Sequence, residues 1–189
     1  QQPIASEDDR THIVVNGEFY GFEPIQRRLE QRGHHLRTRS DSEIALHLYE
    51  EMGTHCMHDL RGEFAFVLWD EAHHTLFAAR DRFGIKPLFY AEHDGILYLA
   101  SEVKALFAAG VPARWDSESV FRSVDVSGSP HRTLFHGIRQ VPPGHYLVAT
   151  EGHMHLGCYW DFDYPAAQQI RPNGNEAEYR LPLTYPGNE

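Results

Sequence analysis

The chain has 189 residues, of which 41% are hydrophobic and 12% aromatic, so it can bury a large core and is not a wholly disordered protein. Its 17 Lys and Arg against 27 Asp and Glu give a formal net charge of −10, which argues against nucleic acid or an anionic membrane as a partner. The longest uninterrupted apolar run, Phe64–Trp69, is too short to span a membrane.

The first part of the chain predicts strands and helices in alternation. They are a strand over 12–17, a helix over 22–32, a short strand over 35–38 and a helix over 42–52. The pair Asn16-Gly17 has the composition of a tight turn and would end the first strand. Ser40 and Glu43 have the spacing of a capping box at the start of the second helix, which buries one apolar face.

The second part of the chain predicts mainly short strands. They cover residues 62–69, 75–80, 87–91, 96–100, 145–150 and 154–159, with helices over 102–109 and 117–124. Because Phe64–Trp69 is apolar at nearly every position, this strand should be covered on both faces. Asp94-Gly95 is typical of a two-residue hairpin turn. We therefore expect a layered α+β domain over 1–164, followed by a linker or loosely ordered tail over 165–189.

Two short segments carry candidate site residues. Asn16 and Gly17 offer a side-chain amide and a backbone N–H at one point, and two such donors could polarise a developing oxyanion; the alternative is a plain turn. Asp41 could pair with the ammonium group of an amino-acid substrate. Its alternative role is a helix-terminal carboxylate that complements the dipole of the following helix.

The other chemistry-bearing residues favour structural roles. In the charged segment Arg80–Lys86, Asp81 could form an ion pair that fixes the loop, with Gly84 supplying a turn. Cys56 and Cys158 are expected to be buried small hydrophobes rather than nucleophiles, and two cysteines without a disulfide framework fit the reducing cytoplasm. The 14 histidines show no complete metal-ligand spacing, so no metal site is predicted.

Six motifs occur in an order that resembles a known family. They are Asn16–Tyr20 (NGEFY), Ser40–Glu43 (SDSE), Leu60–Phe66 (LRGEFAF), Arg80–Tyr90 (RDRFGIKPLFY), Ala100–Leu106 (ASEVKAL) and Val141–Gly144 (VPPG). Together they resemble the glutaminase domain of glutamine-hydrolysing asparagine synthetases, a class II glutamine amidotransferase, over about residues 2–164.

The resemblance implies a fold, a reaction and roles for four residues. The fold would be a four-layer αββα sandwich of N-terminal-nucleophile hydrolase type, in which an N-terminal Cys attacks the side-chain amide of glutamine. Asn16 and Gly17 would form the oxyanion hole, Glu18 would contact the glutamine amide, and Asp41 would hold its ammonium group. The released ammonia would pass to a C-terminal synthetase domain that uses ATP and Mg, whereas this chain would need no cofactor. Cytoplasmic homodimers would fit the family.

The sequence also departs from the family pattern. It begins at Gln1 without the N-terminal Cys and contains no ATP-binding loop of the synthetase half, so we expect this polypeptide alone to release no ammonia from glutamine. One alternative is a non-catalytic scaffold domain, as in β-lactam synthetases and lasso-peptide cyclases. Another is a stand-alone module that binds an amino acid. The acceptor of the ammonia, aspartate or a specialised metabolite, stays open.

Overall fold

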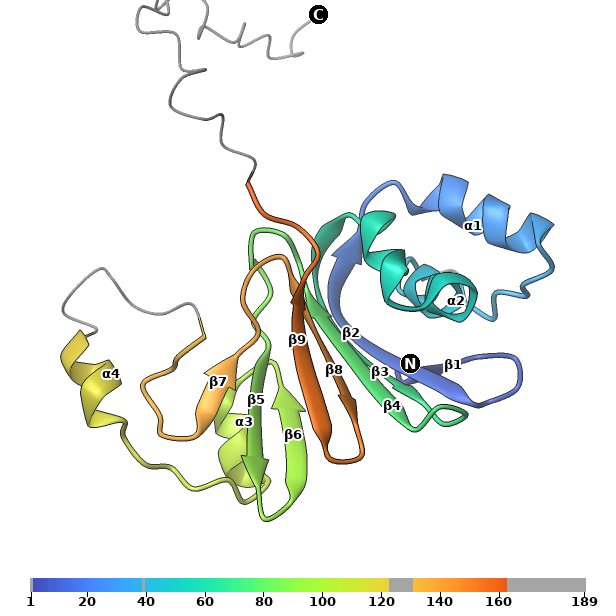
Figure 1. Ribbon diagram of the computed structural model, residues 1–189. Coiled ribbons are helices and arrows are strands. Elements are labelled where there is room, and N and C mark those ends of the chain that lie inside the picture. Colours follow the sequence, from blue (N-terminus) through green and yellow to red (C-terminus); the bar gives the residue numbers. More distant parts are fainter. Residues whose placement is uncertain (1, 39, 123–130, 163–189) are drawn as a thin grey trace, which may run out of the picture.

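Two antiparallel sheets form the centre of the computed structural model, which describes residues 2–38, 40–122 and 131–162 (Figure 1). The larger sheet has the strand order β1-β2-β3-β4-β8-β9 and the smaller one the order β6-β5-β7. The strands of the larger sheet are β1 (Ile4–Ala5), β2 (Thr11–Phe19), β3 (Gly62–Asp70), β4 (Thr75–Arg80), β8 (His145–Thr150) and β9 (His153–Cys158). Those of the smaller sheet are β5 (Phe89–His93), β6 (Ile96–Ala100) and β7 (Ile138–Gln140).

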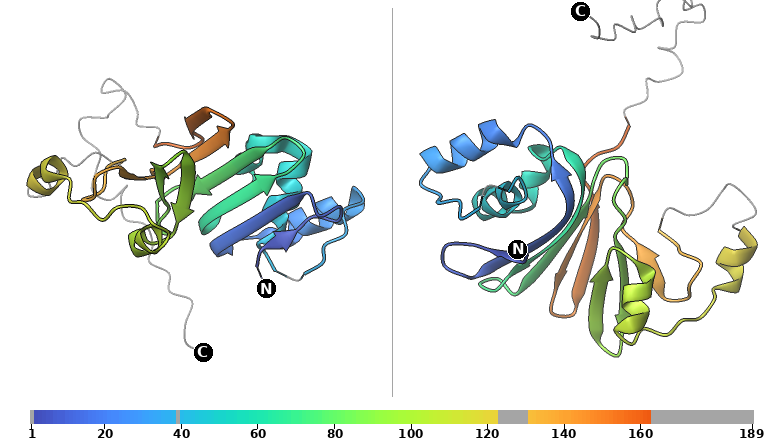
Figure 2. Two further views of the ribbon diagram at one scale, coloured as in Figure 1. Left: turned by 90° about the horizontal axis from the view of Figure 1, so that it is seen from below. Right: turned by 180° about the vertical axis from the view of Figure 1, so that it is seen from behind.

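Helices cover the outer faces of both sheets (Figures 1 and 2). α1 (Phe22–Gln31), α2 (Glu43–Met52) and the 3-10 helix η1 (Gly53–His58) lie against the larger sheet, and α3 (Val103–Ala108) packs on β5 and β6. α4 (Ser117–Arg122) lies at the edge of the molecule, where the carboxylate of Asp116 accepts a hydrogen bond from Ser119 N at 2.8 Å. The helix–sheet–sheet–helix order confirms the predicted four-layer αββα fold.

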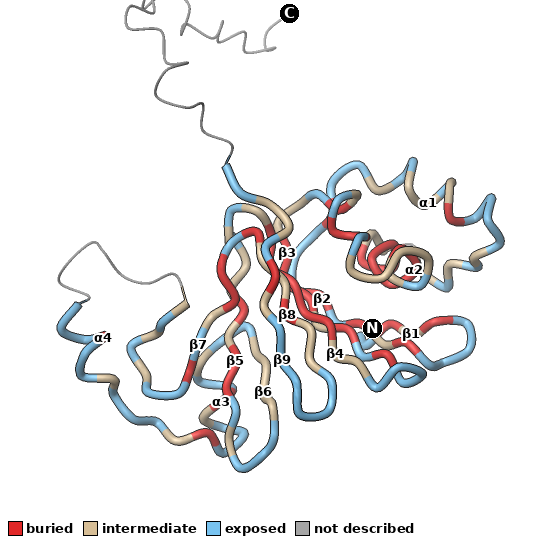
Figure 3. The backbone as a smooth tube through the Cα atoms, in the orientation of Figure 1, coloured by how far each residue is buried: buried red, intermediate tan, exposed pale blue. Residues whose placement is uncertain are grey.

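β3 lies in the middle of this stack and is covered on both faces, as its composition predicts. Phe64, Phe66 and Leu68 belong to the core between the larger sheet and the helices. Ala65 and Val67 point the other way and pack in the core between the two sheets. Small side chains on this second face let the sheets approach closely, and the buried segments in Figure 3 run along these strands.

α2 is more buried than a helix with one apolar stripe. Every residue from Glu43 to Leu48 is buried, because α1 packs on the side of α2 that would otherwise face water. Two of these residues, Glu43 and His47, are ionisable, so their burial requires partners. The partners come from the loop before the helix and from the helix itself.

The predicted strand over 35–38 does not form. The carboxylate of Glu43 accepts hydrogen bonds from Arg37 N at 2.6 Å and from Thr38 N at 2.7 Å, and Glu7 accepts one from His35 N at 2.7 Å. These backbone groups are therefore bonded to side chains rather than to a neighbouring strand. The same contacts explain why the capping box is absent, since the Glu43 side chain turns to residues 37 and 38 instead of back to Ser40.

The remaining elements differ from the sequence predictions mainly at their ends. β1 and β7 were not predicted, because two or three residues carry too little pattern. The hairpin at Asp94-Gly95 is confirmed, with φ of 51° and 76° at its two residues. Residues 123–124 of the predicted helix and the predicted tail over 165–189 lie outside the described residues. Within the described part of the chain, no helix combines the length and the apolar character needed to cross a membrane.

Candidate functional site

Asn16 and Gly17 lie inside a strand and do not form the predicted turn. β2 continues to Phe19, and Asn16 and Gly17 stand opposite Ala65 and Phe64 of β3. Gly17 has a φ of +128°, a conformation that glycine adopts readily and other residues do not. The glycine therefore serves the strand itself rather than a reversal of the chain.

The glycine is needed because its positive φ would direct a side chain into the backbone of β3. A Cβ on Gly17 would lie 1.9 Å from the carbonyl oxygen of Glu63, and a Cβ on Gly62 would lie 2.1 Å from that of Glu18. Two glycines thus face each other diagonally across the pair of strands. Neither position has room for a side chain, so the backbone at Gly17 is fixed by its partner strand.

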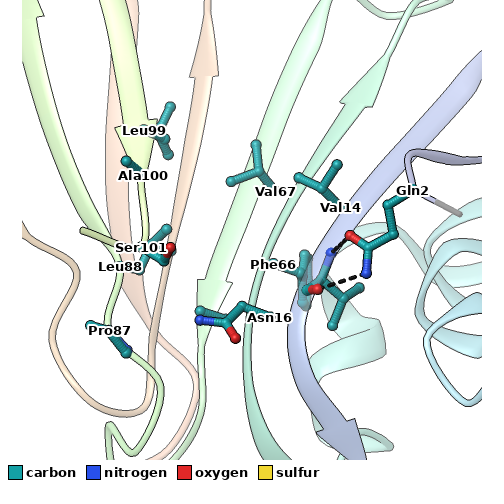
Figure 4. Close-up of a pocket in the computed structure, with 12 residues that line it drawn as sticks. Gln2, Val14, Asn16, Phe66, Val67, Pro87, Leu88, Leu99, Ala100 and Ser101 are labelled. Carbon is teal, nitrogen blue, oxygen red and sulfur yellow. Dashed lines mark hydrogen bonds between the residues drawn. The ribbon is translucent and has the colours of Figure 1, made fainter. Parts of the chain in front are cut away.

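The outer edge of β2 carries backbone groups that alternate in direction. Val15 N and O are bonded to the side-chain amide of Gln2, each at 2.8 Å (Figure 4), and Phe19 N donates to Asp41 Oδ2 at 2.5 Å. Tyr20 N points the opposite way, to the carbonyl of Arg61. Because directions alternate along a strand, the N–H of Gly17 faces the same outer edge as those of Val15 and Phe19.

Asp41 does not cap α2. The N-cap residue of that helix is Ser42, whose side chain makes no capping hydrogen bond, and the Asp41 carboxylate instead faces the end of β2 through Phe19 N. Asp41 and Gly17 therefore lie along one strand edge, and Phe19 N, which contacts Asp41, is about 7 Å from Gly17 N at the usual rise per residue. An extended glutamine has its ammonium group and side-chain amide at a comparable separation.

Asn16 projects into a pocket of about 250 Å³ between the two sheets. In Figure 4 its side chain extends from β2 toward the segment that carries Pro87. One wall comes from β2 and β3; the other comes from residues 87–88 and 99–101 of the smaller sheet and its approach. The walls are largely apolar, and the polar side chains among them are Gln2, Asn16 and Ser101. Sequence reasoning missed Gln2, which belongs to no motif, and Ser101, which lies in the motif Ala100–Leu106 but was given no role there.

The other predicted site residues do not line this pocket. Gly17 presents only its backbone at the edge of β2, and Asp41 lies farther along that edge. Glu18 is exposed and stands opposite Glu63 in the β2–β3 pair, where two like charges face each other. A hydrogen bond from the neighbouring Tyr20 to Glu63 raises the pKa of that tyrosine. The structure thus brings Asn16, Gly17 and Asp41 to one stretch of β2, and the contact of Glu18 with a substrate amide stays a prediction.

The charged segment Arg80–Lys86 has a structural role, but not through the predicted ion pair. Asp81 is fully buried, and its carboxylate accepts three backbone hydrogen bonds, from Phe83 N and Ile85 N at 3.0 Å and from Lys86 N at 2.9 Å. Arg80 donates in turn to the carbonyls of Gly84, Lys86 and Val141 at 2.7–2.9 Å.

Burial lowers the pKa of the Arg80 guanidinium, and the surrounding carbonyls satisfy its donors. The two charges therefore hold the backbone of the loop that leads to Pro87 and Leu88 on the pocket wall. Gly84, with a φ of +66°, supplies the predicted turn.

The two cysteines differ in a way that the sequence did not predict. Cys56 is buried in the helix-side core, and burial raises its pKa to about 12. Cys158 is exposed, so its predicted burial is wrong; it lies on the edge strand β9, with β3, β4 and β8 between it and β2. Neither thiol is placed to attack a group held beside Asn16 and Gly17.

This difference predicts the reactivity of the two thiols. At pH 8 the Cys158 thiol should react rapidly with Ellman's reagent, whereas Cys56 should react roughly 100-fold more slowly or only after unfolding, because it is inaccessible and very little of it is thiolate. Cys158→Ser should remove the fast phase. Two thiols reacting at equal rates in the native chain would contradict the burial of Cys56.

Known proteins resemble the chain over most of its length. Residues 1–160 match the family described as glutamine amidotransferase domain. The chain is 40% identical to amidase chry2 of Gibberella zeae over 166 aligned residues. The alignment covers 87% of this chain and 24% of that protein. It is 36% identical to glutamine-hydrolysing asparagine synthetase 3 of Bacillus subtilis over 168 aligned residues. This alignment covers 86% of this chain and 27% of that protein.

A solved structure shares the fold. The glutamine phosphoribosylpyrophosphate amidotransferase of Bacillus subtilis superposes with a TM-score of 0.62 over 84% of this chain and 32% of that chain, at 20% sequence identity. The chain spans about a quarter of the length of the curated relatives named above.

Proposed function

Because the chain belongs to the glutamine amidotransferase domain family, we propose that it binds glutamine and polarises its side-chain amide in a glutaminase reaction. The products would be glutamate and ammonia, within an enzyme similar to asparagine synthetase. The observation that carries the proposal is the placement of Asn16 beside the pocket and of Gly17 and Asp41 along one edge of β2. A carbonyl oxygen between the Asn16 amide and the Gly17 N–H would have two donors, which is what an oxyanion hole requires.

The proposed reaction is an acyl transfer. A thiolate attacks the side-chain carbonyl carbon of glutamine, and the C=O electron pair moves to the oxygen held by Asn16 and Gly17. Re-forming the carbonyl expels the nitrogen, which takes up a proton and leaves as ammonia. Water then cleaves the thioester to give glutamate and restore the thiol. Cys56 and Cys158 are both unsuited to the attack by burial or position, so the proposal assigns the thiol to an N-terminal Cys of the whole enzyme.

Substrate orientation would come from charge. The Asp41 carboxylate would pair with the ammonium group of glutamine while still accepting the hydrogen bond from Phe19 N. Glu18 would contact the amide nitrogen. The presence of Asn16 and Gly17 on β2 and of Asp41 at its edge supports the catalytic interpretation over a scaffold domain, because a scaffold needs neither amide donors nor a carboxylate at that edge.

The rest of the proposed enzyme lies outside this chain. Relatives several times longer than the chain support a C-terminal synthetase domain, in which ATP and Mg would activate a carboxylate that the ammonia attacks. Both cysteines are unpaired, which supports a cytoplasmic location. Pairing into homodimers stays a prediction.

Calorimetric titration of the purified chain with L-glutamine tests the proposal. We expect saturable binding without ammonia release. Asp41→Asn should weaken glutamine binding roughly 10- to 100-fold, because it removes one negative charge from a charge-assisted contact, while the Asn oxygen can still accept from Phe19 N. Glutaramic acid, which lacks the ammonium group, should bind the wild-type chain and Asp41→Asn equally.

A matched substitution at an exposed carboxylate, Asp94→Asn, should leave glutamine affinity unchanged. If Asp41→Asn weakened glutaramic acid as much as glutamine, Asp41 would act on the fold rather than on the ammonium group. Absence of glutamine binding by the folded wild-type chain would contradict the proposed amino-acid site. Steady ammonia release by this chain would contradict the assignment of the thiol to an N-terminal Cys of the whole enzyme.

A further inference from the structure

Four potential metal ligands from three separate segments meet on the helix side of the larger sheet. Glu7 lies between β1 and β2, His34 follows α1, and His47 and Glu50 are three residues apart on α2. One ligand atom from each residue lies within 4.8 Å of each of the others. This cluster lies on the opposite side of the larger sheet from the pocket beside Asn16.

Both imidazoles direct the same nitrogen at the same two carboxylates. His47 Nδ1 lies 2.8 Å from Glu50 Oε2 and 3.9 Å from Glu7 Oε2. His34 Nδ1 lies 3.7 Å from Glu50 Oε2 and 4.0 Å from Glu7 Oε1. The two rings pack against each other with centroids 4.7 Å apart. The inner atoms therefore comprise two imidazole nitrogens and two carboxylates.

A second pair of carboxylates faces the outer nitrogens of the same rings. His47 Nε2 lies 3.5 Å from Glu43 Oε1, and His34 Nε2 lies 3.5 Å from Glu51 Oε1. Glu43 is fully buried and is held in place by Thr38 and the backbone of Arg37. A carboxylate hydrogen-bonded to the far nitrogen is the usual outer partner of a metal-binding histidine, because it fixes the tautomer and the ring orientation. Glu43 and Glu51 lie where such partners are found, at 3.5 Å from the two Nε2 atoms.

The two imidazoles do not carry enough protons to satisfy all the carboxylates around them. A neutral imidazole carries one N–H. His47 Nδ1 is hydrogen-bonded to Glu50 Oε2 at 2.8 Å, and because a carboxylate only accepts, the proton of this bond is on Nδ1. Within the described part of the chain, the buried His47 Nε2 is then left without a hydrogen-bond partner. A metal ion in place of the shared proton would bind the Nδ1 atoms of both rings and the carboxylates of Glu7 and Glu50, and each Nε2–H would face Glu43 or Glu51. Two nitrogens and two carboxylate oxygens form a donor set that suits Zn²⁺ in tetrahedral coordination.

We propose that Glu7, His34, His47 and Glu50 bind one zinc ion that ties the β1–β2 turn and the loop after α1 to α2. The expected role is structural, since four protein ligands complete a tetrahedral site. The ion would also fix the position of α2, which begins two residues after Asp41. The zinc proposal does not depend on the role proposed for Asp41. Zinc bound by His34, His47 and the two carboxylates would stabilise the folded chain against unfolding, because the ligands come together only in the native state.

The test uses the 189-residue chain without an oligohistidine tag, stripped with a chelator and titrated with ZnCl₂. We expect one saturable site per chain, a higher unfolding temperature with zinc, and, with CoCl₂, the intense visible absorption of tetrahedral Co²⁺. His34→Gln and Glu50→Gln should each weaken zinc binding about tenfold or more. Both positions are partly exposed, so these variants should fold, whereas His47 is buried.

His35→Gln is the matched control. Its side chain is exposed and lies outside the cluster, and only its backbone N–H contacts Glu7, so zinc affinity should be unchanged. Equal affinity in the wild type and His34→Gln would overturn the proposal, because the binding would then come from other histidines. No saturable zinc binding would also overturn it and leave a proton-bridged histidine–carboxylate network.

Discussion

Gly17→Ala should lower the free energy of unfolding by about 4 kcal/mol and abolish glutamine binding. The added Cβ would lie 1.9 Å from the Glu63 carbonyl oxygen, and that neighbour is backbone of a central strand, so it cannot move aside as a side chain can. Overpacking and a left-handed φ at a non-glycine residue each cost roughly 1–3 kcal/mol. Urea denaturation followed by fluorescence measures the loss.

Gly33→Ala separates the two causes. Gly33 also has a positive φ, +100°, but a Cβ there would meet nothing within 4 Å. It should therefore show the backbone strain alone, about 1–2 kcal/mol. Equal losses in the two variants would mean that the contact of the added Cβ with the β3 backbone contributes nothing. Glutamine binding should survive in Gly33→Ala, since that residue lies at the end of α1.

The Asn16-Gly17 pair shows where sequence reasoning reached its limit. Asn-Gly is typical of hairpin turns, and the local pattern contains no competing signal. The decisive partner is Gly62, more than forty positions later in the sequence, whose lack of a side chain lets β3 pair closely with β2. The long-range pairing of β2 with β3 therefore outweighs the local preference of Asn-Gly for a turn. The resemblance to a family implied an oxyanion hole at this pair, which stays a prediction, but not its place inside a strand.

Polar side chains show the same limit. The spacing of Ser40 and Glu43 predicted a capping box, and the charges around Asp81 predicted an ion pair. In both cases the carboxylate bonds to backbone N–H groups instead, because a curved loop presents several donors to one acceptor. Sequence spacing shows which charges are close along the chain, but not which N–H groups the folded loop turns toward them.

The long periodic segments were predictable for the opposite reason. β3 is apolar on both faces because it lies between a helix layer and a second sheet, and its composition alone predicts that burial. β4, β6 and β8 match their predicted limits, since turn residues bound each of them. By contrast, Glu7 and His34 come from segments without any shared pattern. The β1–β2 turn brings Glu7 to His47, and the packing of α1 on α2 brings His34 there.

Asp81→Asn should lower the free energy of unfolding by about 3–4 kcal/mol, although it changes no side-chain volume. The buried carboxylate accepts hydrogen bonds from Phe83 N, Ile85 N and Lys86 N. An Asn amide has one acceptor oxygen and would turn an NH₂ group toward at least one of these donors. Hydrogen bonds to a charged group contribute about 1.5–3 kcal/mol each, and a buried donor left unsatisfied adds a further cost. Urea denaturation measures the change.

Asp161→Asn is the matched control, because Asp161 is exposed and accepts a hydrogen bond from Phe162 N at 2.7 Å, next to it in the chain; its effect should stay within about 0.5 kcal/mol. Asp81→Asn should also weaken glutamine binding in the variant that remains folded, since the loop it holds carries Pro87 and Leu88 into the pocket wall. A large loss of stability with unchanged glutamine affinity would show that this loop supports the sheets but not the site. A loss no larger than that of Asp161→Asn would show that the three backbone donors find water once the charge is gone.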